Sequence, residues 1–147
     1  MIIHILNEQD SIKISSEQVE KLVLQVLEAE NCTCDEVSVT FVDTKRICAL
    51  HEEFFQDDSP TDCISFPMDM EDDETYRVLG EIFVCPQAAL DYNPKHPYEE
   101  TTLYIIHGLL HLLGYDDIDR KKRALMRNEE KRLMKLAKKH KCILQPS

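Results

Sequence analysis

Apolar and polar residues alternate with two different periods along the chain, and the two periods predict both helices and strands. In residues 15–30 the apolar side chains recur every three or four positions, the period of a helix with one buried face. They are Val19, Leu22, Val23, Val26 and Leu27. Serine residues precede them and predict the N-terminal cap of this helix. In residues 36–43, EVSVTFVD, apolar and polar residues alternate, which predicts a strand with one buried face.

The remaining segments are assigned in the same way, and together they predict the fold class. Strands are predicted at 2–6, 63–69 and 79–86, and helices at 44–55, 86–93, 98–113 and 118–138. An acidic stretch separates the second of these strands from the third. Pro97 suits the first turn of the helix at 98–113, and Gly114 ends that helix. Because strands and helices are mixed without strict alternation, we predict one α+β domain over residues 1–147, with a mixed central sheet packed by helices.

Charge is distributed unevenly over this predicted fold. The formal net charge is -11, yet residues 120–141 contain 11 Lys and Arg against two acids. The rest of the chain contains 6 Lys and Arg against 26 acids. The basic segment is either a solvated helix whose basic face complements the acidic body, or a contact surface for a polyanion. Charge alone favours the first interpretation.

Composition narrows the class of protein. Hydrophobic residues make up 43% of the chain and charged residues 31%, values typical of a folded globular protein. The apolar runs are too short and too interrupted to span a bilayer, and the N-terminus has no export signal. We therefore expect a cytoplasmic protein without a membrane partner.

The stretch HGLLHLLGYDD, residues 107–117, contains the candidate chemistry. His107 and His111 lie four positions apart, and thus on one face of the predicted helix. Gly114 stops the helix, so that the chain can fold back and bring Asp117 to the same point. Two histidines alone are more often core residues, but the glycine and the acid at this offset favour a metal site. Three ligands with one open position are the pattern of a catalytic zinc centre, in which the metal lowers the pKa of a water.

The residue after the first histidine separates two classes of metal enzyme. Zinc peptidases with the pattern HExxH have a glutamate there as the general base. In this chain the residue is Gly108. The motif therefore favours a metal hydrolase of another kind, with a metal-dependent peptidase as an alternative.

Three motifs together resemble one known family. HGLLHLLGYDD, SPTDCISFP at 59–67 and LGEIFVCP at 79–86 are similar to the motifs of the YbeY-type bacterial rRNA maturation factors, which are metal-dependent endoribonucleases. The resemblance extends from about residue 37 to residue 133. It implies an α+β fold with one central sheet and one metal, usually zinc, held by three histidines. It also implies action on RNA, chiefly in maturation of the 3′ end of small-subunit rRNA and in ribosome quality control.

The chain departs from the family pattern at two positions. His107 and His111 match the first two ligands, but Asp117 stands where the family usually has the third histidine. A carboxylate lowers the Lewis acidity of the metal and makes the site harder, so manganese or iron(II) becomes plausible beside zinc. Phe55 stands where the family usually has an arginine that is thought to help catalysis. Losing such a donor typically costs about 3 kcal/mol of transition-state stabilisation, so we expect reduced or altered activity.

Several other residues have two possible roles. Thr61 and Asp62 more commonly cap a loop than act in chemistry. Glu81 is a candidate hydrogen-bond partner for a ligating imidazole, or an exposed strand acid. Asp116 either orients a ligand or closes the turn. For a protein that handles rRNA, the basic segment gains a second interpretation as a phosphate contact, at about equal weight with the solvated face.

These observations lead to one function and two alternatives. We expect a metal-dependent single-strand endoribonuclease that contains one divalent transition metal and no small-molecule cofactor. Its expected partners are rRNA and the small ribosomal subunit. The alternatives are a non-catalytic, metal-containing ribosome-assembly factor, consistent with Phe55 and Asp117, and the metal-dependent peptidase.

Overall fold

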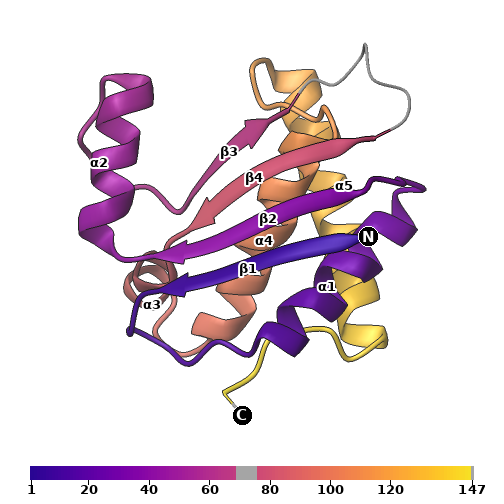
Figure 1. The fold of residues 1–147 in the computed structure, drawn as a ribbon, viewed down its shortest axis with the longest axis horizontal. Coiled ribbons are helices and arrows are strands. Elements are labelled where there is room, and N and C mark those ends of the chain that lie inside the picture. Colours follow the sequence, from indigo (N-terminus) through magenta and orange to yellow (C-terminus); the bar gives the residue numbers. More distant parts are fainter. Residues whose placement is uncertain (69–75, 147) are drawn as a thin grey trace.

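Four strands form one mixed sheet in the computed structural model, which describes residues 1–68 and 76–146. The strands lie in the order β1-β2-β4-β3 (Figure 1). Strand β2 pairs in parallel with both β1 and β4, whereas β3 pairs antiparallel with β4 at one edge. The bounds are β1 Ile2–Glu8, β2 Glu36–Val42, β3 Cys63–Pro67 and β4 Val78–Val84. The predicted combination of parallel and antiparallel pairs is confirmed.

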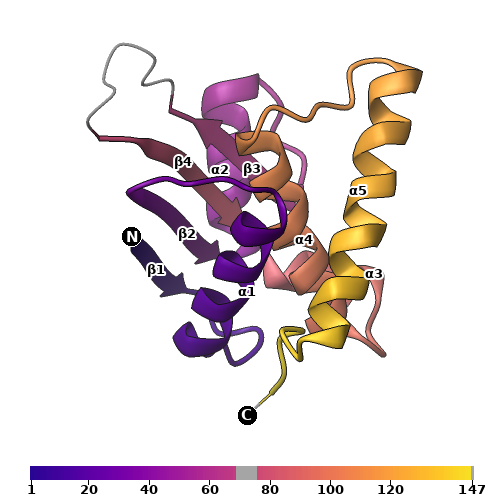
Figure 2. The same cartoon turned by 90° about the vertical axis from the view of Figure 1, so that its right-hand side faces the viewer.

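Helices α1, α4 and α5 form two further layers on one face of this sheet. Figure 2 shows the sheet, then α1 and α4, and then α5 on the outside. Helix α4 contacts β3 and β4 on one side and α5 on the other, so it is buried almost all round. The helix bounds are α1 Ser16–Ala29, α2 Thr44–Phe55, α3 Pro86–Tyr92, α4 Pro97–Leu112 and α5 Arg120–Lys139. The candidate metal motif thus lies on the central helix of an α+β fold.

Local capping explains where the predicted helices begin. Ser15 caps α1 and accepts a hydrogen bond from the Gln18 backbone amide at 3.4 Å, and the five predicted apolar residues are all buried. Helix α5 was expected from residue 118. It begins two residues later, because the Asp119 carboxylate accepts a hydrogen bond from the Lys122 amide at 2.8 Å and so forms the cap. Helix α4 begins and ends within one residue of the prediction.

The interpretation of residues 36–43 as a half-buried strand was wrong in its second half. Strand β2 lies inside the sheet, and its residues from Val39 to Val42 are all buried. The alternation was misleading because Thr40, a polar residue by composition, is only 3% exposed.

Two other expectations concern the acidic stretch and the absence of a membrane-spanning segment. The acidic stretch between the two strand candidates falls largely on residues 69–75, which lie outside the described part of the chain. Within residues 1–68 and 76–146, no helix is both long enough and apolar enough to cross a membrane.

Helix α2 packs against β3 through a second, smaller core. Ile47 and Leu50 of α2 are buried with Ile64 of β3 and with Cys85, which precedes α3. This cluster fixes the C-terminal end of α2, which carries Phe55, beside the strand that leads from the SPTD loop.

Candidate metal centre

Helix α4 places two imidazoles on one face, next to a close contact between Gly108 and the sheet. The Nε2 atoms of His107 and His111 are 3.1 Å apart, and both side chains are partly buried. A Cβ atom on Gly108 would lie 2.9 Å from Cys63 Sγ and 3.0 Å from Ile82 Cγ2. Position 108 is therefore glycine because α4 approaches the sheet closely there, and a glutamate has no room at that position.

The turn after α4 brings the third candidate ligand to the histidines. Gly114 adopts a φ of +102°, which side-chain-bearing residues rarely adopt. Its amide bonds the His111 carbonyl at 3.1 Å, and the Tyr115 amide bonds the Leu110 carbonyl at 3.0 Å. This pair of bonds is the glycine-dependent helix stop that reverses the chain. As a result, one ligand atom from each of His107, His111 and the exposed Asp117 lies within 4.8 Å of the other two.

A carboxylate from α5 orients the first histidine. Glu130 Oε1 lies 2.6 Å from His107 Nδ1. A proton on Nδ1 that is shared with this carboxylate leaves the Nε2 lone pair free and directed at the cluster. The His111 ring is held by a hydrogen bond with the backbone of Tyr115.

The donor set fits a divalent metal ion. Two imidazole nitrogens and one carboxylate are a known ligand set for such ions. For tetrahedral coordination at about 2.05 Å, the two nitrogens should be about 3.3 Å apart. The Nε2 separation of 3.1 Å is close to that value.

The two histidines have opposite pKa shifts. Burial lowers the pKa of His107, but the Glu130 carboxylate, with Asp62 and Asp117, raises it above the ordinary value. Burial and the charge of His107 lower the pKa of His111. The carboxylates around His107 attract a cation, and the lowered pKa of His111 favours the neutral imidazole that can bind one.

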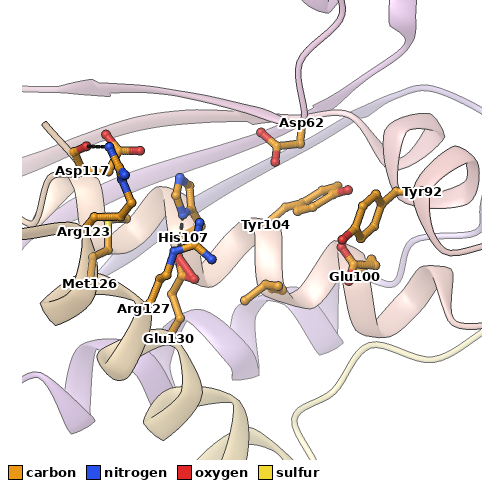
Figure 3. Close-up of a pocket in the computed structure, with 11 residues that line it drawn as sticks. Asp62, Tyr92, Glu100, Tyr104, His107, Asp117, Arg123, Met126, Arg127 and Glu130 are labelled. Carbon is orange, nitrogen blue, oxygen red and sulfur yellow. Dashed lines mark hydrogen bonds and ion pairs between the residues drawn. The ribbon is translucent and has the colours of Figure 1, made fainter. Parts of the chain in front are cut away.

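A first pocket, which we call the α5-side pocket, opens between α4 and α5. It has a volume of about 340 Å³, and Figure 3 shows its lining residues. Four carboxylates line it, those of Asp62, Glu100, Asp117 and Glu130. Two arginines of α5 also line it, Arg123 and Arg127. The Arg123 Nη2 atom donates to the Asp117 carbonyl at 3.4 Å, which ties α5 to the turn that carries the candidate ligand.

A second pocket, which we call the α2-side pocket, lies on the other side of the histidine pair. It has a volume of about 450 Å³ and shares His107 with the first pocket. Phe55 and His51 of α2 line it, with their rings 5.7 Å apart, as do Thr61 and Ser65. Among the described residues that line it there is no lysine or arginine. The candidate metal centre thus lies where two pockets of different character meet.

The predicted site residues are placed as follows. The structure brings His107, His111 and Asp117 together, and it places Phe55, which is 52% exposed, on the α2-side pocket. Asp62 lines the α5-side pocket, and its charge contributes to the raised pKa of His107.

The structure shows the contacts of Asp116 and of the His107 imidazole, for which the sequence left two roles open. The acid that contacts His107 was not predicted. Asp116 accepts a hydrogen bond from the Ile118 amide at 3.2 Å and thus closes the turn. The partner of the His107 imidazole is Glu130 and not Glu81. Glu130 has little signal in the sequence, since it is one of only two acids in a helix whose net charge is strongly positive.

The basic segment divides into two parts. Several of its cations pair with acids of the body: Arg132 with Glu30 at 2.6 Å, and Lys138 with Glu99 at 2.7 Å. These pairs agree with the interpretation of α5 as a basic helix that complements an acidic body. Arg123 and Arg127, in contrast, line the α5-side pocket.

Fold and cluster together define an α+β protein with a candidate three-ligand metal centre on its central helix. A family model described as "Endoribonuclease YbeY" matches residues 4–138. The chain therefore belongs to this family.

Relatives with this name cover nearly the whole chain. A protein of Protochlamydia amoebophila is 51% identical over 142 residues, which are 95% of each chain. One of Chlamydia pneumoniae is 40% identical over 149 residues, covering 97% of this chain and 94% of the relative. A solution structure of a Thermotoga maritima protein aligns with a TM-score of 0.62 at 29% identity, over 95% of this chain and 92% of that one.

Proposed function

We propose that this chain is a metal-dependent endoribonuclease that cleaves single-stranded RNA in the cytoplasm. We propose further that it acts in maturation of the 3′ end of small-subunit rRNA and in ribosome quality control. Membership of the endoribonuclease family and the names of its relatives support the activity. The rRNA substrate and the small ribosomal subunit as partner come from the motif resemblance.

One observation carries the metal-dependent part of the proposal. The ligand atoms of His107, His111 and Asp117 converge within 4.8 Å at the meeting point of two open pockets. A divalent metal held by these three residues would supply Lewis acidity and would lower the pKa of a bound water, which is the chemistry that hydrolysis of a phosphodiester needs. Zinc is the first choice, with manganese or iron(II) plausible because of the carboxylate ligand.

The surrounding residues have supporting roles. Glu130 orients His107 and raises the basicity of its free nitrogen. The pockets on either side leave access for an extended strand, whereas paired duplex RNA presents no free bases to them.

Different residues bear on the two alternatives, the metal-dependent peptidase and the non-catalytic assembly factor. A peptidase needs a general base after the first histidine, and the packing of Gly108 against Cys63 and Ile82 leaves no space for one. A non-catalytic assembly factor is favoured by Phe55, which offers no charge to a phosphate.

A cleavage assay on unlabelled ribosomal and short single-stranded RNA tests the proposal. The purified protein should cleave RNA, lose cleavage in a chelator and regain it on addition of zinc, manganese or iron(II). A protein that contains metal but never cleaves RNA supports the assembly factor instead. Asp117→His serves as a matched variant, since it keeps a ligand but should shift the preference toward zinc.

A further inference from the structure

We propose that Arg123 and Arg127 form a phosphate-binding pair that holds the RNA backbone in the α5-side pocket. This inference rests on the proposed function and deepens it by assigning the side of the site that takes the phosphates. The two arginines are four residues apart on α5 and therefore share one face of the helix. The same face carries Glu130, which contacts His107.

The charge of the pocket makes such a pair necessary. Four carboxylates line the α5-side pocket, and they repel a phosphate in a space of about 340 Å³. Arg123 and Arg127 are the only lysine or arginine residues among its described lining residues. A single nucleotide has a size that a pocket of this kind accepts. An RNA strand that enters here must find its protein counter-charge in these two guanidinium groups.

The two guanidinium groups are also available. Among the described residues, Arg127 has no hydrogen bond or ion pair with the protein. Arg123 donates only a long bond of 3.4 Å to the Asp117 carbonyl, which leaves its other donors free. Three other cations of the same helix are occupied, because Lys122, Arg132 and Lys138 pair with acids. An arginine also presents a planar fork of donors that matches the oxygens of a phosphate.

The position of the pair defines a path for the strand. Figure 3 shows Arg123 beside Asp117, and Arg127 beside His107 and Glu130. A phosphate on this pair lies next to the candidate metal centre. The following or preceding nucleotide then extends past His107 toward the α2-side pocket, which has an exposed aromatic ring at Phe55 and no lysine or arginine among its lining residues.

Binding of a fluorescein-labelled 12-nucleotide single-stranded RNA tests the inference. Anisotropy is measured in a chelator, so that no cleavage occurs, over a series of salt concentrations. The variants are Arg123→Gln and Arg127→Gln, with Arg127→Lys to keep the charge without the fork. Lys135→Gln is the matched control, because it removes one positive charge from an exposed position about 12 Å further along the same helix.

Each arginine-to-glutamine change should weaken RNA binding about tenfold. It should also lower the salt dependence by about 0.7 per lost phosphate contact. Arg127→Lys should recover part of the affinity, and Lys135→Gln should change it less than twofold. Equal losses in the control and in the arginine variants would overturn the inference, because general charge would then explain binding. A wild-type protein that does not bind RNA would overturn it as well.

The outcome separates this inference from the proposed function. Wild-type protein that binds RNA through the two arginines but does not cleave it with any metal contradicts the proposed function and leaves the phosphate-binding pair standing. Cleavage that is unaffected by both glutamine variants contradicts the pair and leaves the proposed function standing.

Discussion

The two pockets that share His107 differ in the charges that they present. On the α5 side, two arginines stand among four carboxylates, and Glu130 reaches the imidazole directly. On the α2 side, the lining is aromatic, hydroxyl-bearing and free of lysine and arginine among the described residues. Both are built on the same central helix, so the difference comes from the neighbours of α4 and not from the motif itself.

The two pockets show how one motif can have an asymmetric site around it. A phosphate is attracted to guanidinium groups, whereas an unpaired base is attracted to an exposed ring. Phe55 offers no positive charge on the α2 side, whereas α5 supplies positive charge on the other side. Substitutions at specific residues test this asymmetry.

The largest effect is expected at Gly108, where α4 packs closely against the sheet. Gly108→Glu places a carboxylate against Cys63 and Ile82, where a Cβ atom alone comes within 2.9 Å and 3.0 Å of them. Overpacking together with a buried charge should lower the free energy of unfolding by about 4 kcal/mol. Urea denaturation measures this loss.

The control for this change introduces the same residue where there is space. Ala124→Glu on the exposed face of α5 should change the free energy of unfolding by less than about 0.5 kcal/mol. If Gly108→Glu were as stable as the control and gained peptidase activity, the packing argument against a peptidase would be wrong.

The next effect concerns the α5 contribution to the metal centre. Glu130→Gln weakens the contact that orients His107, and should lower metal affinity by about 10- to 100-fold. A titration against a competing chelator measures it. Glu129→Gln is the neighbouring control, since Glu129 bonds Arg132 and Tyr115 and not the ring. Equal losses in the two variants would show that Glu130 has no special role.

A smaller effect is expected from adding charge to the α2 side. Phe55→Arg places a guanidinium in the pocket that lacks lysine and arginine, and should raise kcat/KM for RNA cleavage by about tenfold. Phe55→Gln removes the ring without adding charge and should not raise it. An unchanged rate in Phe55→Arg would remove the argument that the missing arginine limits activity.

The smallest effect lies in the ion-paired part of α5, away from both pockets. Arg132 lowers the pKa of Glu129 to about 2, whereas burial raises the pKa of its neighbour Glu30. A lowered pKa stabilises the fold above the unfolded value of about 4.5 and loses that stabilisation as pH falls toward 2. Because the groups are partly exposed and Glu30 opposes the shift, the net contribution should be about 1 kcal/mol.

Arg132→Gln should remove this part of the acid dependence. The free energy of unfolding, measured by urea denaturation between pH 6 and about pH 3, should fall less steeply with falling pH in the variant than in the wild type. Identical pH dependence in both proteins would show that the network around Arg132 does not contribute to stability.

Periodicity and capping identified most of the helices, because these signals are local. The five apolar residues of α1 and the serine cap were predicted and are observed. The pair His107 and His111 was found for the same reason, since a spacing of four is a local property of a helix. The burial of Thr40 and the role of Glu130 were missed, because both depend on which element lies beside another in the fold. A net charge also could not reveal which arginines of α5 would face the site.

The content of transition metal in the purified protein tests the central claim most directly. We predict about one divalent ion per chain in the wild type and none in the double variant His107→Ala/His111→Ala, with His4→Ala, an exposed histidine, as the control that keeps its metal. Elemental analysis gives both values. Equal metal content in the wild type and the double variant, or none in the wild type after metal addition, would contradict the account.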